Sequence, residues 1–173
     1  MIFISGVHGV GKAYFCNIVK EKLSIETYSA SALIAEKKKS GFAADKLIPD
    51  IDENQQYLLA AVEELRSAGT DFIIDGHFCL LNAQGIVTRI PEETFTTLHP
   101  DAIVLLTENP SVIASRRQDR DHIEHLESDI KAFQEEEIKY ATEVADLLCV
   151  PLKVSNGSGD IEGIVEFIRT RRM

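Results

Sequence analysis

The 173-residue chain has no tryptophan, only two methionines and only three cysteines. Cys16, Cys79 and Cys149 lie far apart and show no spacing typical of a metal site. An odd number of scattered cysteines argues against a disulfide framework. We therefore expect reduced, buried thiols.

The chain also lacks a long hydrophobic run. No apolar stretch approaches the roughly 18 residues that a membrane-spanning helix needs. The apolar residues 1–4 give way to Ser5 and Gly6 and follow no basic segment, unlike a signal peptide. We expect a cytoplasmic protein that does not bind a membrane.

Positive charge is scarce. The chain has 18 Lys and Arg residues against 28 Asp and Glu residues, which gives a formal net charge of -10. A general nucleic-acid surface needs basic patches that replace counterions, so we expect no nucleic-acid partner. Any phosphate site must be built locally, against the overall field.

Short apolar segments rich in β-branched residues alternate with amphipathic ones. Such segments are typical of parallel strands covered on both faces. The alternation predicts one α/β domain over residues 1–173 with a doubly wound parallel sheet. We expect strands at 2–4, 72–74, 102–106 and 150–154, a weaker strand at 25–28, and helices over much of 57–65, 123–148 and 161–168.

Two segments interrupt this alternation. Residues 31–50 are polar and predict an excursion above the sheet. Residues 78–90 predict a β-hairpin, with its turn at residues 82–85 between apolar flanks.

A glycine-rich segment follows the first strand directly and precedes a helix. Its sequence, GVHGVGK, has the G-x-x-x-x-G-K spacing of a phosphate-binding loop. Glycines let successive backbone N–H groups point at phosphate oxygens, and the helix N-terminus adds its positive end. The strand–loop–helix context favours a nucleotide site over a chance glycine-rich turn. We expect ATP to contact Gly6, His8, Gly9, Val10, Gly11 and Lys12, with Lys12 at the β- and γ-phosphates.

The residue after the lysine departs from the motif. Ser or Thr normally stands there and holds Mg²⁺, whereas this chain has Ala13 followed by Tyr14. Neither side chain supplies an aliphatic hydroxyl. We expect both residues to lie against the nucleotide, without direct coordination of Mg²⁺ from this position.

An acidic residue, Asp75, ends the apolar segment Phe72-Ile73-Ile74. Ligands bind beside the C-terminal ends of parallel strands, so Asp75 is the candidate to hold a Mg²⁺ water or to orient the phosphoryl acceptor. The alternative is a turn aspartate before Gly76. His77 follows, either as a structural residue or as a contact to the acceptor phosphate.

Three arginines, Arg116, Arg117 and Arg120, are concentrated between two helical patterns. Guanidinium groups suit phosphate oxygens and transition-state charge, so a mobile lid at residues 116–121 is one interpretation. A surface salt-bridge ladder with neighbouring acids is the other. Arg116 is also a candidate to stack on the nucleotide base.

Taken in order, these motifs are similar to one kinase family over nearly the whole chain. The chain resembles the archaeal-type adenylate kinase-like branch of the nucleoside monophosphate kinases in the blocks GVHGVGK, YSASALI, FIIDGH, LHPDAIVLLTENPSVIASRRQDR and PLKVSN. The resemblance implies a P-loop three-layer sandwich whose five-strand parallel core has the order 2-3-1-4-5. It also implies an acceptor-binding excursion at about 29–57, a short lid near 116–121, and adenine against the loop that contains Asn156.

Two departures from this family concern the acceptor phosphate. Residues 31–35 end in alanine where many members carry a clamping arginine, and residues 75–79 also lack the arginine of their block. Either the acceptor is not an ordinary nucleoside monophosphate, or other residues replace these arginines. We expect the acceptor to contact Ser31 and Leu33, with His77 or Arg89 in place of the missing arginines.

Two functions are open at this point. The first is an ATP-dependent phosphotransferase that moves the γ-phosphoryl group to a small nucleotide-like acceptor, with Lys12, Asp75 and the three arginines as catalytic residues. The second is a nucleotide-binding switch or assembly factor with weak ATPase activity, which Ala13 and the missing arginines favour. The expected ligands are ATP, Mg²⁺ and a small nucleotide, and no motif indicates an oligomeric state.

Overall fold

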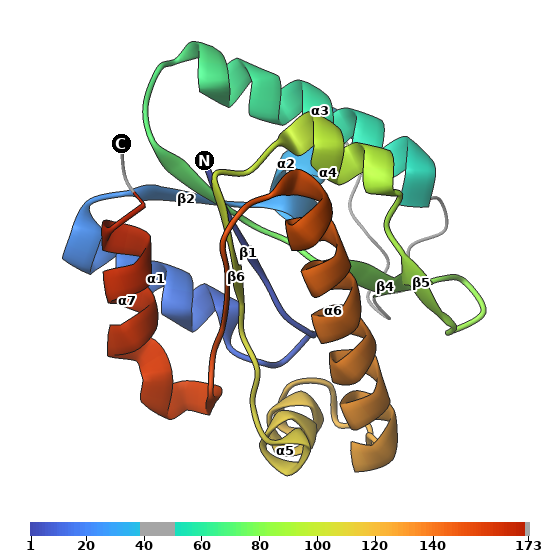
Figure 1. The fold of residues 1–173 in the computed structure, drawn as a ribbon. Helices are drawn as coiled ribbons and strands as arrows, with labels where there is room; N and C mark the ends of the chain where they lie inside the picture. Colours follow the sequence, from blue (N-terminus) through green and yellow to red (C-terminus); the bar gives the residue numbers. More distant parts are fainter. Residues whose placement is uncertain (39–50, 172–173) are drawn as a thin grey trace.

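The structure, a computed structural model, describes residues 1–38 and 51–171. Its centre is a five-stranded parallel sheet in the order β2-β3-β1-β6-β7 (Figure 1). Counted along the chain within this sheet, the order is 2-3-1-4-5, so the expected P-loop sandwich is confirmed. The strands are Ile2–Ser5 (β1), Glu26–Ser29 (β2), Phe72–Asp75 (β3), Ala102–Leu105 (β6) and Leu152–Val154 (β7).

The inner strands form because their side chains are apolar on both faces. Every residue of β1 and β6 is buried, and so are the first three residues of β3. The edge strands β2 and β7 are less buried. In the register, Ile4 lies beside Asp75 on one side and Val104 on the other. The carboxyl ends of the three inner strands therefore meet at one edge of the sheet.

Helices cover both faces of the sheet (Figure 1). On one face, α1 (Lys12–Leu23) packs against α7 (Ile161–Arg169). On the other lie α3 (Ile51–Ser67), α4 (Glu92–Leu98) and α6 (Glu127–Leu148), and α4 contacts both of the others. Among the helices of residues 1–38 and 51–171, none combines the length and the apolar character needed to cross a membrane.

The segments expected to form the excursion and the lid are partly helical. α2 (Ala30–Lys38) begins the excursion and packs against α3, while residues 39–50 lie outside the described residues. α5 (Pro110–Asp121) is capped at its N-terminus by Asn109, whose side-chain oxygen accepts a hydrogen bond from the Ser111 N–H at 3.0 Å. Residues 116–121 are the second half of α5, so the three arginines are presented by a helix. A short 3-10 turn, Gly157–Asp160, leads into α7.

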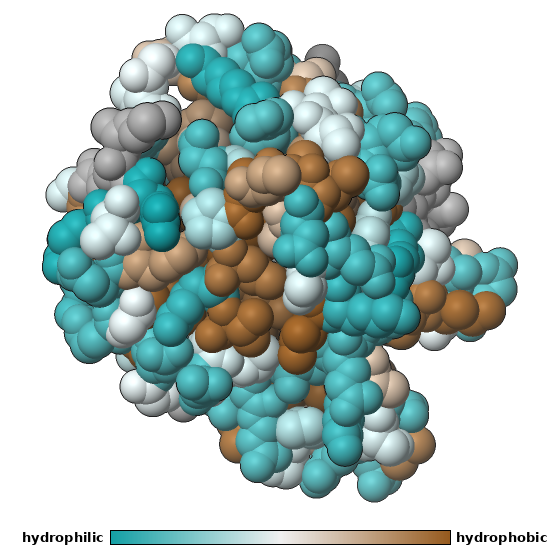
Figure 2. Space-filling view, viewed as in Figure 1, coloured by the Kyte–Doolittle hydropathy of each residue, from teal (hydrophilic) through white to brown (hydrophobic). Residues whose placement is uncertain are grey.

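The hairpin predicted over residues 78–90 is confirmed. β4 (Cys79–Leu81) pairs with β5 (Val87–Arg89) in antiparallel fashion, and the Ile90 N–H donates to the Phe78 carbonyl at 2.9 Å. The Asn82 side-chain oxygen accepts from two backbone N–H groups beyond it, which closes the turn. Figure 2 shows apolar side chains at the projecting hairpin and near the centre of the same face.

The cysteine prediction is right for two residues and wrong for the third. Cys16 and Cys79 are buried free thiols, and burial raises the pKa of Cys16 to about 12. Cys149 is exposed. Cys149 directly follows the last residue of α6 and adopts a left-handed conformation with φ 54°. At this end of the helix its side chain faces solvent.

Gly76 occupies a place that only glycine fits. A Cβ atom there would lie 2.7 Å from Cζ of Phe3 and 2.9 Å from its Cε2. The Phe3 ring packs edge-on against Phe78 at 5.3 Å and Phe95 at 5.7 Å between ring centroids, so a shift of the ring would disturb both aromatic contacts. All three rings are buried.

We predict that Gly76→Ala lowers the free energy of unfolding by about 1–3 kcal/mol, the usual cost of an overpacked core. Denaturant-induced unfolding followed by circular dichroism measures this change. Gly159→Ala is the matched control, since a Cβ at Gly159 meets no atom within 4 Å. The control should change stability by less than about 0.5 kcal/mol. Equal stability of the two variants would contradict the packing argument.

Candidate active site

The phosphate loop joins β1 to α1 at the edge where the inner strands end. Gly9 and Gly11 adopt φ angles of 84° and 108°, which residues with a Cβ rarely adopt. Val7 and Val10 are buried, and the Val10 N–H donates to the Val7 carbonyl at 3.2 Å. The loop is thereby curled over the start of α1, where unpaired backbone N–H groups favour anions.

The ammonium group of Lys12 lies between this loop and the end of β3. Its Nζ donates to the Gly6 carbonyl at 2.6 Å and lies 3.9 Å from Oδ1 of Asp75. The Lys12 side chain is only 9% exposed. Burial lowers the pKa of Lys12, and the charges of Asp75 and Glu137 oppose that shift. A phosphate at the loop would meet a cation that is already stripped of water.

Asp75 ends β3 where the sequence predicts an acid. Its carboxylate borders the cavity beside the loop and is 17% exposed. Burial raises the pKa of Asp75, whereas the charge of Lys12 lowers it. No group of three or more His, Cys, Asp and Glu side chains in the described part of the chain is placed to hold a metal. A metal beside Asp75 would therefore keep water and phosphate ligands, as Mg²⁺ readily does.

Two histidine rings contact each other beside the lysine. The rings of His8 and His77 lie 4.2 Å apart between centroids, and Nε2 of His77 is 3.4 Å from Nζ of Lys12. Burial and the charge of Lys12 hold the pKa of His77 well below its usual value. His77 is therefore neutral at pH 7 and offers a ligand a hydrogen bond rather than a positive charge.

A cavity of about 460 Å³ lies beside the loop. Its walls include the buried side chains of Phe3, Leu58 and Phe95. Residues that the sequence predicts for the site supply part of the lining: His8, Gly9, Gly11, Lys12, Ala13, Tyr14, Ser31, Asp75, His77 and Arg120.

Three buried polar residues of the cavity were missed by the sequence analysis. Asn54 and Gln55 on α3 and Thr94 on α4 line the cavity, with exposures of 2%, 4% and 4%. On each helix they share the buried face with apolar residues one turn away. The only available signal was therefore a polar residue on an otherwise apolar face. Their amide and hydroxyl groups can donate and accept hydrogen bonds inside an apolar space.

Arg117 lies beneath the phosphate loop. Its Nε donates to the His8 carbonyl at 2.8 Å, and the residue is 8% exposed. A Cβ added to Gly9 would come within 3.0 Å of Cγ of Arg117, so the side chain fits closely under the loop. Arg117 is not part of the cavity lining. Arg117 supports the loop from outside the cavity lining, so its contact with the transferred phosphoryl group stays a prediction.

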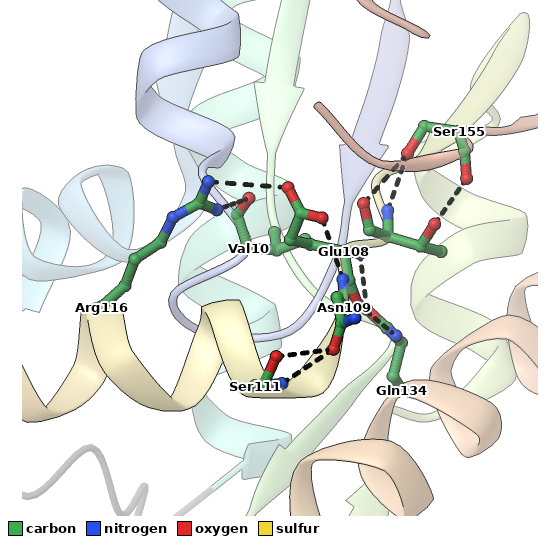
Figure 3. Close-up of polar contacts among 8 residues, drawn as sticks. Val10, Glu108, Asn109, Ser111, Arg116, Gln134 and Ser155 are labelled. Atoms are coloured by element: carbon green, nitrogen blue, oxygen red, sulfur yellow. Dashed lines mark hydrogen bonds and ion pairs between the residues drawn. The ribbon is translucent and has the colours of Figure 1, made fainter. Parts of the chain in front are cut away.

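Arg116 and Arg120 are one helical turn apart on α5 and face the loop differently. Arg116 donates from Nη1 to the Val10 carbonyl at 3.0 Å, and its Nη2 lies 3.5 Å from Oε2 of Glu108 (Figure 3). Arg120 lines the cavity, and its Nη2 lies 3.3 Å from Oδ2 of Asp121. Of the three arginines, only Arg120 reaches the cavity.

Polar contacts join the loops that follow β6 and β7 (Figure 3). The Thr107 N–H donates to Oγ of Ser155 at 2.8 Å. The side chain of Gln134 on α6 exchanges two hydrogen bonds with the backbone of Glu108, at 3.1 and 3.0 Å. Asn156 is exposed in this region and does not line the cavity, so its contact with adenine stays a prediction.

Comparison with known proteins agrees with this geometry. The family model described as AAA domain matches residues 5–138, which contain the loop, Asp75 and the three arginines. An adenylate kinase from Pyrobaculum aerophilum is 35% identical over 136 residues, and the match covers 74% of this chain and 68% of that protein. The chain belongs to the adenylate kinase-like family of P-loop kinases.

Solved structures share the fold of this adenylate kinase-like chain at low sequence identity. A shikimate kinase from Bacteroides thetaiotaomicron is 15% identical with a TM-score of 0.59, covering 98% of this chain and 95% of that one. The YorR protein from Bacillus subtilis, in complex with phosphorylated GDP, is 19% identical with a TM-score of 0.59, covering 97% and 95%. A deoxyadenosine kinase from M. mycoides is 16% identical with a TM-score of 0.54, covering 98% and 97%. These likenesses support the fold alone.

Two residues expected at the acceptor of this kinase lie elsewhere. Arg89 points from the hairpin to α6, where it pairs with Glu136 at 2.6 Å and Glu143 at 2.5 Å. Hydrogen bonds to Glu143 and Glu136 raise the pKa of Arg89. Its charge is therefore used to hold the hairpin, and it does not replace the missing acceptor arginines. Leu33 packs against the core, and Ile34, its neighbour on α2, lines the cavity instead.

The positions of the arginines predict that one alanine variant is destabilised and that another is not. Arg117→Ala should lower the free energy of unfolding by about 1–3 kcal/mol, because the His8 carbonyl loses the partner that it has in a part-buried contact. Arg120→Ala is the matched comparison on the same helix and should change stability by less than about 0.5 kcal/mol. Denaturant-induced unfolding measures both values. If Arg120→Ala is as destabilised as Arg117→Ala, the division between a supporting and a cavity-facing arginine is wrong.

Proposed function

We propose that this chain is an ATP-dependent phosphotransferase that moves the γ-phosphoryl group of ATP to a nucleotide held in the cavity. The observation that carries this proposal is the position of the cavity. Lys12, Asp75 and Arg120 border the same space as a wall of buried apolar and amide side chains. An acceptor in that space would lie next to the γ-phosphate of ATP on the loop, which is the proximity that phosphoryl transfer requires.

The donor site in this proposal combines the loop with the cations around it. Backbone N–H groups and Lys12 hold the phosphates, and Arg116 and Asn156 lie on the side proposed for the adenine. Mg²⁺ fits beside Asp75, through water, because Ala13 has no oxygen to offer and the Asp75 carboxylate borders the cavity. The metal would neutralise phosphate charge during transfer.

The acceptor site suits a nucleobase. Phe3, Leu58 and Phe95 provide apolar walls for a flat ring, and Asn54 and Thr94 provide hydrogen-bonding groups on the wall formed by α3 and α4. Pockets of this kind bind through apolar area and are made selective by a few placed polar groups. Ser31 and neutral His77 lie on the same lining and complete the set of acceptor contacts.

Transfer in this site would depend on position and charge. The transferred phosphoryl group carries spread negative charge, which cations stabilise in a water-poor site. Arg120 lines the cavity with its guanidinium 3.3 Å from Asp121, a contact on the protein surface that a phosphate can replace. Arg120 is therefore the arginine we assign to transition-state charge.

A second function is favoured by one observation. Among the described residues that line the cavity, Lys12 is the only lysine and Arg120 the only arginine. Arg89 pairs with Glu136 and so replaces neither of the missing acceptor arginines. A nucleotide-binding switch or assembly factor with weak ATPase activity would need no acceptor clamp. It would hydrolyse ATP without stimulation by an acceptor.

The test is ADP formation from ATP and Mg²⁺, with and without AMP, GMP, CMP or UMP. We expect at least one nucleoside monophosphate to stimulate ADP formation strongly, with the matching nucleoside diphosphate as the second product. Arg120→Ala should reduce the stimulated rate by about 10³-fold or more, as loss of an arginine finger does. Slow ADP formation that no acceptor stimulates would contradict the kinase and favour the switch.

The alanine after Lys12 gives a separate prediction about the metal. Ala13→Ser adds one oxygen in the first turn of α1, where P-loops supply a Mg²⁺ ligand. We expect a lower half-saturating Mg²⁺ concentration for ATP turnover, because the hydroxyl replaces one water of the octahedral shell. A Mg²⁺ titration of both proteins measures it. An unchanged Mg²⁺ dependence would show that position 13 does not face the metal, and the proposed placement of Mg²⁺ would fail.

A further inference from the structure

Glu137 is a carboxylate on the buried side of α6. The residue is 1% exposed, and Phe133 and Ala141, one turn before and after it, are buried apolar residues. Moving a carboxylate out of water costs several kcal/mol unless the charge is paired and hydrogen-bonded. The partners of Glu137 therefore decide whether the fold can contain it.

Three donors surround the Glu137 carboxylate. The Ser5 hydroxyl and the Phe78 N–H, at 2.9 Å, donate to Oε1, and the Cys79 N–H donates to Oε2 at 2.7 Å. Burial raises the pKa of Glu137, while these hydrogen bonds and the charge of Lys12 lower it. An ionised carboxylate accepts all three hydrogen bonds at once. Each oxygen of the buried Glu137 carboxylate therefore has at least one hydrogen-bond donor.

The three donors belong to the framework of the nucleotide site. Ser5 is the last residue of β1 and directly precedes Gly6 of the phosphate loop. Phe78 and Cys79 directly follow residues 75–77, which comprise the last residue of β3 and the two residues after it. Glu137 therefore ties α6 to the end of β1, where the phosphate loop begins, and to the start of β4, which follows residues 75–77.

Residues 75–77 also contact the phosphate loop. The His77 ring contacts the His8 ring at a tilt, with 4.2 Å between centroids, and Nε2 of His77 lies 3.4 Å from Nζ of Lys12. Asp75 lies 3.9 Å from the same ammonium group. A displacement of the backbone after His77 would move both contacts, because residues 75–79 are continuous in the chain.

We propose that Glu137 is a positioning residue of the nucleotide site. Its buried carboxylate holds the end of β1 and the backbone of Phe78 and Cys79 together, and so keeps His77 and Lys12 aligned with the phosphate loop. It touches no substrate in this arrangement. Its charge also offsets that of Lys12, whose burial would otherwise be less favourable.

Tyr140 offers a matched control on the same helix. Its hydroxyl donates to the Ile90 carbonyl at 2.7 Å, so it anchors the other end of the hairpin to α6. This contact is buried and is far in sequence from the loop and from Lys12. Tyr140→Phe removes one buried hydrogen bond between α6 and the hairpin and leaves the Glu137 network intact.

The experiment compares Glu137→Gln, Tyr140→Phe and the unchanged protein. Gln keeps the size of Glu but presents an amide NH₂ group to donors, so one N–H group of residues 78–79 loses its partner. ADP affinity is measured by titration calorimetry at a temperature where thermal unfolding shows every variant folded. Hydrogen exchange at the amides of residues 6–12 and 76–79 is measured on the same samples without nucleotide.

We expect Glu137→Gln to raise the Kd for ADP about 10- to 100-fold, which lies within the cost of leaving one buried donor without a partner. Amides in both segments should exchange faster than in the unchanged protein. Tyr140→Phe should lower Tm while leaving the Kd and the exchange at residues 6–12 unchanged. If Glu137→Gln lowers Tm but leaves ADP affinity and exchange at residues 6–12 as they are, Glu137 only stabilises the fold and the proposal is wrong.

Discussion

Burial of one cation, Lys12, is the constraint on which the rest of the site depends. In a chain of net charge -10, long-range electrostatics repel phosphate, so attraction has to come from short range and low solvent exposure. The Lys12 side chain is 9% exposed, and the carboxylates of Asp75 and Glu137 make that burial tolerable. The buried Glu137 carboxylate in turn needs hydrogen-bond donors. This need explains why the end of β1, the start of β4 and α6 meet beside Lys12.

Helix α6 is the element that holds the parts of the site together. From its buried side, Glu137 accepts hydrogen bonds from the hairpin start and from β1, and Tyr140 reaches the hairpin end. Its acidic surface pairs with Arg89, and Gln134 binds the backbone after β6. An amphipathic pattern predicts a helix here but not these roles. The helix acts as a scaffold because its polar side chains reach strand ends that are distant in sequence.

Local signals explain which expectations succeeded. The loop, the acid at the end of β3 and the hairpin depend on residues within a few positions of one another, so glycine spacing, apolar runs and turn chemistry predict them. The assignments of Arg89 and Leu33 failed because each depends on direction. Arg89 turns toward Glu136 and Glu143, and Arg117 turns under the loop to the His8 carbonyl. Which face of a helix or strand a residue occupies is set by packing partners from elsewhere in the chain.

By itself the sequence determined the class of the protein: a parallel α/β sheet, a phosphate loop at its first strand, and an acid beside it. Those features follow from hydrophobic periodicity and from backbone conformations that only certain residues adopt. Tertiary structure alone decided the rest. It placed Asn54 and Thr94 in the cavity, separated the three arginines into different positions, and brought Glu137 to the end of β1 and the start of β4. The physical reason is that burial and hydrogen-bond partners are properties of the packed chain, so a polar residue on an apolar helix face gains its role only when its partners are in place.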